Sequence, residues 1–370
     1  MKKKYLFIYG QINCGGAERV LIDILNNFDY SSNEVDLLQI IGGGDLSDEL
    51  PKEVNILTAW NSYSLNYKHA NKLSTKFSNN TLFKIKLQKV LCDKKYDVAI
   101  SFLEGMPLKI HSLVTSIAKR NYSWVHCDLY SNPYEKNLFR KNDELYAYNI
   151  MDSIICVSSE TKDAFIKRFP KCNSNINVIY NPLDFVKIKK LSTEYSVNNT
   201  DYTIVVVGRL VCQKKIDRVI RIAKKIKDDN LPITIQIIGD GVLKNKLMDF
   251  AKNLNVDKHI QFLGYKKNPY PYIKAANLLL STSENEGFSL VICEAMCLDI
   301  PVISTKTCGP LEILDNNKYG ILCDHNDDSI YNAIKLLYSD KELSKKYSNG
   351  GYDRVKMFSI ENCMTKIYKL

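Results

Sequence analysis

Short runs of consecutive apolar residues alternate along the chain with longer segments in which apolar residues recur every three or four positions. The short runs have the length and composition of strands buried on both faces, and the longer segments are typical of amphipathic helices. This alternation predicts parallel strands joined by crossover helices. The predicted strands are residues 4–9, 96–102, 122–126, 152–158 and 176–180, and then 202–208, 233–239, 259–264, 276–281 and 301–305.

The alternation starts twice, and a polar stretch without periodicity, residues 181–201, separates the two halves as a linker would. A chain of 370 residues also exceeds the size that one hydrophobic core usually supports. We therefore predict an α/β protein of two doubly wound, Rossmann-like parallel-sheet domains that face each other across a cleft. The predicted parts are an N-terminal domain over 1–185, a C-terminal domain over 186–352, and a C-terminal helix over 353–370 that packs back on the N-terminal domain.

Composition is that of a folded protein, with 45% hydrophobic and 25% charged residues. The first apolar stretch is interrupted at Gly10, Gln11 and Asn13, and no apolar run reaches 18 residues. We therefore expect a cytoplasmic protein that is neither secreted nor membrane-spanning. The eleven cysteines are scattered without C-x-x-C spacing, which favours reduced thiols over disulfides or a zinc site.

The formal net charge of +10 indicates an anionic partner such as a nucleic acid, a phospholipid or a phosphorylated substrate, although solubility alone also explains an excess of this size. A nucleic-acid binder would need basic residues interleaved with exposed aromatics, or a recognisable reading helix. The sequence offers neither, so we expect no nucleic-acid partner.

Candidate chemistry lies in the loops that follow the predicted strands, because ligands of open α/β sheets bind at the carboxyl ends of the strands. Gly15 and Gly16 precede a helix and let backbone amides approach an anion, although a tight turn without a ligand explains them equally well. Arg209 and Lys214 follow strand 202–208 and are suited to neutralise a diphosphate. We expect the neighbouring Lys215 and Arg218 to be solvated. 

The segment SENEGFSLVICEAM, residues 283–296, brackets apolar residues with two acids. Glu286 lies on the predicted loop and Glu294 lies one to two turns into the predicted helix, so the two carboxylates are suited to accept hydrogen bonds from sugar and ribose hydroxyls. A phosphate between them would rest on the amides around Ser289 and Leu290. The alternative is a capping acid in the loop and a salt-bridged acid in the helix.

In this order and spacing, the motifs resemble those of the family 4 glycosyltransferases of the GT-B fold. The resemblance runs from Gly15 to about Ser359 and rests on GGAERVL, WVH at 124–126, VIYNPLD at 178–184, VGRL with the following QK, IIGDGVL at 237–243, and the E-x7-E pattern of Glu286 and Glu294. It implies a retaining transferase that moves a hexose or N-acetylhexosamine from a nucleotide-sugar, with UDP-sugars favoured, to a glycan acceptor.

The resemblance also implies roles for single residues. Arg209 and Lys214 would hold the donor diphosphate, Glu286 would contact the donor sugar, Glu294 would contact the ribose, and His126 would lie beside the anomeric centre. It implies no metal and no cofactor, because the nucleotide-sugar is a substrate. Lys215 departs from the family pattern, which often has glycine there. The predicted catalytic residues are His126, Glu286, Arg209 and Lys214, and the predicted donor-binding residues are Gly15, Gly16, Arg209, Lys214, Glu286, Gly287, Phe288, Ser289, Leu290 and Glu294.

The acceptor should bind the N-terminal domain, with Glu104 and His126 as candidate contacts. Residues 72–95 carry seven lysines against one aspartate and an apolar stripe of Phe83, Leu87, Val90 and Leu91, which predicts a basic amphipathic helix suited to an anionic membrane. A helix docked on the sheet with a solvated basic face explains the pattern equally well. A polyisoprenyl-linked acceptor in surface polysaccharide or glycolipid assembly is therefore expected, and a catalytically silent sugar-nucleotide-binding module or a soluble acceptor is the alternative.

Overall fold

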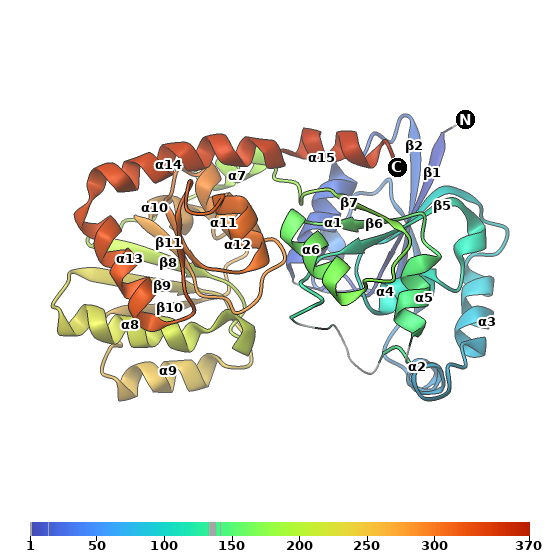
Figure 1. The fold of residues 1–370 in the computed structure, drawn as a ribbon, viewed down its shortest axis with the longest axis horizontal. Helices are drawn as coiled ribbons and strands as arrows, with labels where there is room; N and C mark the ends of the chain where they lie inside the picture. The colour runs from blue at the N-terminus through green and yellow to red at the C-terminus, as the bar shows by residue number, and fades with distance from the viewer. Residues whose placement is uncertain (1, 14, 132, 134–137, 141) are drawn as a thin grey trace. The chain divides into compact units, whose positions relative to one another are not determined.

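The computed structural model describes residues 2–13, 15–131, 133, 138–140 and 142–370. The chain divides into two compact units, which we name unit 1 (residues 1–182 and 360–370) and unit 2 (residues 183–359). Each unit contains one parallel sheet with helices packed on it (Figure 1). The predicted α/β class with two parallel sheets is therefore confirmed.

Unit 1 is built on a seven-stranded sheet in the order β3-β2-β1-β4-β5-β6-β7. Its strands pair in parallel, and the carboxyl ends of β1, β4 and β5 therefore meet at one edge. The strands are β1 (Lys3–Tyr9), β2 (Asn33–Ile41), β3 (Asn55–Trp60), β4 (Tyr96–Ser101), β5 (Ala118–Val125), β6 (Ser153–Cys156) and β7 (Asn175–Val178), and the helices are α1 (Gly16–Asn26), α2 (Leu65–Phe77), α3 (Thr81–Val90), α4 (Met106–His111), α5 (Asp143–Asn149), α6 (Ser159–Arg168) and α15 (Ile360–Ile367).

The sequence pattern missed β2 and β3 of this sheet, and in unit 2 it missed the three-residue strand β13 (Ile321–Cys323). Strand β2 begins with polar residues at Asn33, Glu34 and Asp36, which interrupt its apolar run. Strand β3 lies at the edge of the sheet and leaves Ile56 45% exposed, so it lacks the continuous apolar pattern of a central strand.

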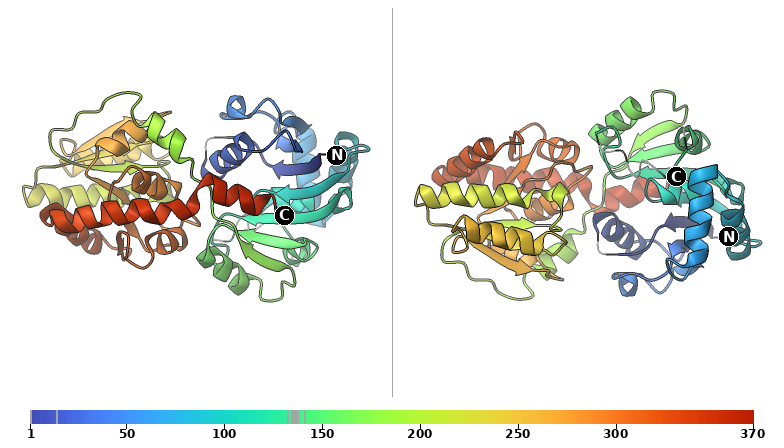
Figure 2. Two further views of the ribbon diagram at one scale, coloured as in Figure 1. Left: turned by 90° about the horizontal axis from the view of Figure 1, so that it is seen from above. Right: turned by 90° about the horizontal axis from the view of Figure 1, so that it is seen from below.

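The last residues of the chain complete unit 1. The Tyr368 hydroxyl accepts a hydrogen bond from the Asp29 amide at 2.7 Å, its ring packs edge-on against Phe28, and the Tyr122 hydroxyl donates to the Leu370 carbonyl at 3.2 Å. Both views of Figure 2 show this red end of the chain beside the strands of unit 1. The segment predicted as one helix over 353–370 is interrupted by a 3-10 turn at Lys356–Phe358.

The predicted basic helix over residues 72–95 is wrong, because α2 and α3 are separate helices. Ser78 ends α2 in the left-handed conformation, with φ 52°. Phe83 and Leu87 of α3 are fully buried against the sheet in the same cluster as Trp60 and Tyr67. The predicted apolar stripe is therefore core, and it cannot face a membrane while this helix is docked.

Unit 2 is built on a six-stranded parallel sheet in the order β10-β9-β8-β11-β12-β13. Helix α7 lies inside the segment 181–201 that was predicted to be an irregular linker, and the division between the units falls at 182/183. The strands are β8 (Tyr202–Val207), β9 (Ile233–Ile238), β10 (Ile260–Gly264), β11 (Leu278–Ser281), β12 (Val302–Thr305) and β13 (Ile321–Cys323), and the helices are α7 (Phe185–Leu191), α8 (Ile216–Asp228), α9 (Lys244–Asn253), α10 (Tyr270–Ala275), α11 (Leu290–Cys297), α12 (Cys308–Leu314), α13 (Asp327–Ser339) and α14 (Lys341–Val355).

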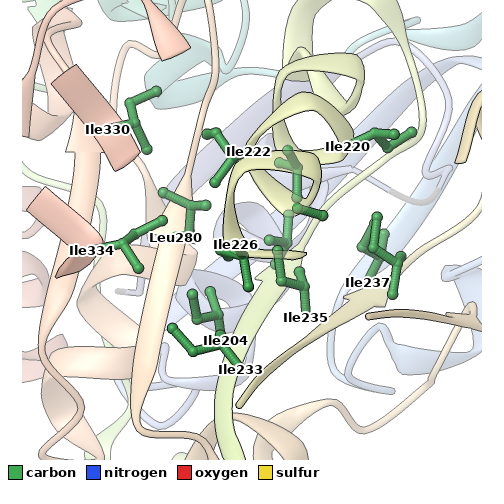
Figure 3. Close-up of a cluster of buried hydrophobic side chains, with 14 of the residues drawn as sticks. Ile204, Ile220, Ile222, Ile226, Ile233, Ile235, Ile237, Leu280, Ile330 and Ile334 are labelled. Carbon is green, nitrogen blue, oxygen red and sulfur yellow. The ribbon is translucent and has the colours of Figure 1, made fainter. Parts of the chain in front are cut away.

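An isoleucine-rich core holds α8 and α13 against this sheet. Ile222 and Ile226 of α8 lie beside Ile204, Leu280 and other strand residues, and α13 contributes Ile330 and Ile334 (Figure 3). These side chains are fully buried or nearly so. Burial of each such side chain stabilises the fold by about 1.5–3 kcal/mol, and β-branched residues suit the strands. The core thus fixes the strand ends from which the site loops depart.

Two glycines of unit 2 should respond oppositely to alanine. Gly239 has φ +146°, and an added Cβ would lie 1.9 Å from the Gly208 carbonyl oxygen, whereas an added Cβ at Gly350 of α14 meets the Tyr319 ring at an ordinary 3.4 Å. We expect Gly239→Ala to lower the free energy of unfolding by about 1–3 kcal/mol and Gly350→Ala to raise it by about 0.5–1 kcal/mol. Thermal unfolding followed by circular dichroism measures both. Midpoints that move in the same direction would contradict this account of the two positions.

Candidate donor-binding and active site

The loops that follow β8 and β11 form the core of the site in unit 2. These strands are neighbours in the sheet and run in parallel, so their carboxyl ends lie side by side. The Gln213 side-chain amide donates to the Asn285 carbonyl at 2.7 Å, and the Glu284 amide donates to the Gln213 carbonyl at 2.8 Å. The two loops are therefore tied together by side-chain and backbone hydrogen bonds.

Lys214 and Glu286 form an ion pair across these loops. Both side chains are mostly buried, with 21% and 13% of their surfaces exposed. The Thr282 hydroxyl donates to the Lys214 carbonyl at 2.9 Å, and the Ser283 hydroxyl donates to Glu286 Oε1 at 3.0 Å. Two side chains that lie 72 positions apart in the sequence are thus held in contact. Thr282 and Ser283 support them, and the sequence analysis did not identify either residue.

Arg209 is exposed at the carboxyl end of β8. Its backbone is fixed by its neighbour, because the Leu210 amide donates to the Asp240 carbonyl at 2.8 Å and the Leu243 amide donates to the Leu210 carbonyl at 3.0 Å. Within the described part of the chain, the structure assigns its guanidinium no hydrogen bond or ion pair. Arg209 therefore offers a cation in the same loop as Lys214.

The two cations next to Lys214 differ from each other. Lys215 has φ 50° and ψ 44°, a left-handed conformation that glycine adopts without strain, and its ammonium lies 3.6 Å from Glu284. This backbone explains why glycine suits the position. The predicted solvation of Arg218 is wrong, because its side chain is buried and donates to the carbonyls of Thr282 and His325 at 3.2 and 3.0 Å. Arg218 is a structural brace beneath the site.

Helix α11 places Glu294 on its first turns. Glu294 Oε1 accepts a hydrogen bond from the Tyr270 hydroxyl of α10 at 3.0 Å, a contact that no sequence signal predicted. Gly287, Phe288 and Ser289 are buried just before the helix, whereas Leu290 is partly exposed. Helix α12 braces the preceding loop. Its Gly309 amide donates to the Glu286 carbonyl at 2.8 Å, and an added Cβ at Gly309 would lie 2.7 Å from the Phe288 Cα.

In unit 1, Gly15 and Gly16 lie where β1 gives way to α1. Gly15 is extended, with φ −156° and ψ 172°, and an added Cβ at Gly16 would meet no atom within 4 Å. Neither backbone conformation demands glycine, although an added Cβ at Gly15 would lie 2.3 Å from the Glu18 carboxylate, at the end of a flexible side chain. The adjacent loop after β2 was not predicted. It contains Gly44, whose φ of +125° and close approach to the backbone of Ile12 require glycine.

His126 follows β5, and its ring packs 4.9 Å from the Phe102 ring. Burial lowers the pKa of His126 to about 3, and a hydrogen bond to the backbone of Phe102 opposes the shift only in part. Its Nε2 atom is buried and has no hydrogen-bond partner among the described residues. The imidazole is therefore neutral at pH 7 and retains one uncommitted nitrogen.

Glu104, predicted to contact an acceptor, is only 2% exposed. Its Oε2 atom accepts a hydrogen bond from the His126 amide at 2.9 Å. Burial raises the pKa of this carboxyl, and hydrogen bonds from Cys127 and from the backbone amides of His126 and Glu104 itself work against the shift. In the structure, the partner of Glu104 is therefore the loop that carries His126.

The ten cysteines within the described ranges form no disulfide. None of the helices in the same ranges is long and apolar enough to cross a membrane.

Comparison with known proteins identifies the class. Residues 187–354 match the family model of the glycosyl transferases group 1. A Campylobacter jejuni protein, N-acetylgalactosamine-N,N'-diacetylbacillosaminyl-diphospho-undecaprenol 4-alpha-N-acetylgalactosaminyltransferase, is 26% identical over 366 residues, which cover 97% of this chain and 96% of that protein. An Escherichia coli UDP-Gal:alpha-D-GlcNAc-diphosphoundecaprenol alpha-1,3-galactosyltransferase is 27% identical over 312 residues, which cover 77% of this chain and 78% of that protein.

Solved structures agree at the level of the fold. Anabaena Alr3699/HepE in complex with UDP-glucose superposes with a TM-score of 0.77, at 20% identity, over 99% of this chain and 98% of that one. The likeness to these structures confirms the predicted GT-B fold class, with two parallel α/β sheets. The C-terminal part of the chain thus resembles the glycosyl transferases of group 1, and the predicted identification of the protein as a glycosyltransferase is confirmed.

Two buried histidines make unit 1 acid-sensitive. His111 is fully buried, its ring nitrogens lie 3.1 Å from Ser101 Oγ and 3.0 Å from Asn121 Oδ1, and burial lowers its pKa to about 4. The unfolded chain binds protons on His111 and His126 below about pH 6.5, but the folded chain does not until about pH 4 and 3. The free energy of unfolding should therefore fall as the pH drops through this window, by about 3 kcal/mol for His111.

The measurement is urea unfolding between pH 7 and 4 followed by tryptophan fluorescence, because Trp60 and Trp124, the two tryptophans of the chain, both lie in unit 1. Glu104 opposes this fall in the free energy of unfolding. Because burial raises its pKa in the folded chain, the folded chain takes up this proton before the unfolded chain does, which stabilises the fold as the pH drops below the raised pKa. His111→Gln, which does not titrate, should flatten the pH profile. An unchanged profile in this variant would refute the role of His111.

Proposed function

We propose that this glycosyltransferase moves a hexose or N-acetylhexosamine, with retention of configuration, from a UDP-sugar to a glycan carried on a polyisoprenyl diphosphate, in the assembly of a surface polysaccharide or glycolipid. The observation that carries the proposal is the Lys214–Glu286 pair, held beside Arg209 at the carboxyl edge of the unit 2 sheet. Support for the acceptor class comes from the relatives, whose names specify undecaprenol-diphosphate-linked sugars. Support for the donor class comes from the UDP-Gal transferase among them.

The donor chemistry follows from charge. Breaking the bond between the sugar and the diphosphate leaves negative charge on the diphosphate, which Arg209 and Lys214 stabilise from fixed positions. The amides at Ser289 and Leu290, where α11 begins, add partial positive charge. Glu286 accepts hydrogen bonds from the sugar hydroxyls. In the folded loop, Lys214 holds that carboxylate in place, so a diphosphate bound to Lys214 has its sugar beside Glu286.

The remaining predicted residues complete the assignment. Glu294, oriented by Tyr270, receives the ribose hydroxyls, and Gly287 and Phe288 line the turn between the two acids. Gly15 and Gly16 of unit 1 keep their predicted role as donor-binding residues. His126 acts as a neutral hydrogen-bonding group and not as an acid at pH 7, because burial holds its pKa at about 3.

We also propose that the reaction needs no metal and no cofactor, because two cationic side chains and a helix start supply the positive charge at the diphosphate. Two other functions compete with the proposal. A silent sugar-nucleotide-binding module would bind the donor but release no nucleotide. A transferase with a soluble acceptor would work at full rate without lipid.

A cytoplasmic enzyme with a lipid-linked acceptor is expected to bind the membrane surface. The corner where α2 meets α3 exposes Phe77, Leu82 and Ile85, at 64%, 40% and 49%. The Ser74 hydroxyl donates to Asn80 Oδ1 at 2.5 Å and fixes this corner. Lysines surround the apolar residues, and exposed apolar and cationic side chains together suit the interface of an anionic bilayer. The corner is formed by Lys76, Phe77, Leu82, Lys84, Ile85, Lys86 and Lys89.

We expect Arg209→Ala and Glu286→Gln each to lower turnover by ~100-fold, because each removes a fixed charge that stabilises the transition state. The assay follows UDP release and product formation from UDP-sugars with undecaprenyl-diphosphate-linked acceptors. Lys258→Ala removes an exposed lysine two residues before β10, at the amino end of this strand and so away from the carboxyl edge that carries the site, and should leave turnover unchanged. Near wild-type turnover in Arg209→Ala or Glu286→Gln at saturating donor would refute the assigned role. Activity lost in EDTA and restored by magnesium or manganese would refute the metal-free proposal.

For the membrane, we expect the protein to cosediment with anionic phosphatidylglycerol vesicles but not with neutral phosphatidylcholine vesicles, and to dissociate as salt is raised. Each lysine near such a surface contributes on the order of 1 kcal/mol at low salt. Changing Lys84, Lys86 and Lys89 together to glutamine should abolish cosedimentation without changing donor binding.

The matched control changes three exposed lysines of unit 2, Lys246, Lys252 and Lys258, to glutamine and removes the same net charge. It should still cosediment. Equal binding of both triple variants would refute the corner as the docking surface and favour a soluble acceptor.

A further inference from the structure

Glu104 is a buried carboxyl that the proposed chemistry does not use. It follows β4, is 2% exposed, and accepts the His126 amide hydrogen at 2.9 Å. The thiol of Cys127 hydrogen bonds to the same carboxyl. One side chain thus holds two consecutive residues of the loop that follows β5.

A carboxyl group in this place is costly. Burying it removes water from a group that ionises readily, and the resulting rise in its pKa reflects that cost. An apolar side chain would pack in the same place without burying any polar atom. Groups with such perturbed pKa values concentrate at functional sites, which favours a role beyond packing.

The surroundings of Glu104 point to His126. Strands β4 and β5 are neighbours, and two residues of the loop after β4 contact His126. The Phe102 ring packs on the His126 ring, with centroids 4.9 Å apart, and Glu104 accepts a hydrogen bond from the His126 amide. The following Gly105 has φ 76°, which allows the chain to turn sharply into α4 directly after the carboxyl. His126 is thereby held from two sides, with its buried Nε2 atom uncommitted.

We propose that Glu104 is a positioning residue for His126, and that it acts by fixing the backbone from which the imidazole projects and not by contacting an acceptor. The proposal rests on the role given to His126 under the proposed function. Without the carboxyl, the His126 amide and the Cys127 thiol lose their hydrogen-bond acceptor. The imidazole then loses its fixed position, while the donor site in unit 2 stays intact.

The first test is a double-mutant cycle on turnover. Glu104→Ala should lower kcat by ~10–100-fold and leave the donor KM within about threefold of wild type. In the His126→Ala background the same change should have little further effect, because residues that act as a unit are not additive. Glu104→Gln, which still offers an oxygen to the His126 amide, should recover most of the activity. Full additivity of the two alanine changes would overturn the proposal, since a merely structural residue acts independently of His126.

The second test does not depend on activity. Hydrogen exchange measured by mass spectrometry on the full chain should accelerate at the His126 amide in Glu104→Ala, and alkylation of Cys127 should accelerate relative to the exposed Cys92. The control is Glu49→Gln, a partly buried acid of the same unit that pairs with Arg19, which should change neither rate.

The two tests separate the failure of this inference from the failure of the proposed function. Unchanged exchange at His126 in Glu104→Ala would overturn the positioning role. Full activity in His126→Ala would refute the role of His126 in the reaction, while faster exchange in Glu104→Ala would still show that Glu104 holds the loop.

Discussion

The uniform direction of the strands is the constraint on which the rest of this structure depends. In a parallel sheet every strand ends at the same edge, so loops far apart in the sequence are delivered side by side without any specific attraction between them. In unit 2 this brings the loop after β8 to the loop after β11, and the Lys214–Glu286 pair then locks them. In unit 1 the same geometry brings Glu104 to His126.

The Lys214–Glu286 ion pair matters for the geometry of the site more than for the stability of the fold. A mostly buried ion pair adds little stability once the cost of desolvation is counted. Between Lys214 and Glu286 it instead fixes the distance between a cation suited to phosphate and an anion suited to hydroxyls. The surrounding hydroxyls of Thr282 and Ser283 keep both groups oriented. Geometry, more than stability, is what this pair contributes.

The sequence predicted most of the central strands, because strands buried on both faces have continuous apolar runs, and it located Arg209, Lys214 and Glu286 after them. It missed the internal strand β2, whose first residues are polar. It could not predict β3, whose edge position leaves Ile56 exposed, nor the burial of Arg218, whose carbonyl partners come from distant loops. It also could not decide the environment of Phe83 and Leu87, because an apolar stripe has the same sequence pattern whether it faces a sheet or a bilayer; the structure agrees with the docked alternative. Contacts such as Tyr270 with Glu294 depend on tertiary structure alone.

The return of the C-terminal segment has a consequence for biosynthesis. Unit 2 is continuous in sequence, but unit 1 is completed by residues 360–370, which are synthesised after the whole of unit 2. Phe28 and Asp29 are synthesised early, and they therefore lack their ring contact and hydrogen bond with Tyr368 while all of unit 2 is translated. During that interval the nascent sheet of unit 1 carries an uncovered apolar patch, so chaperone dependence and aggregation during synthesis should be governed by this late docking and not by the order in which the strands appear.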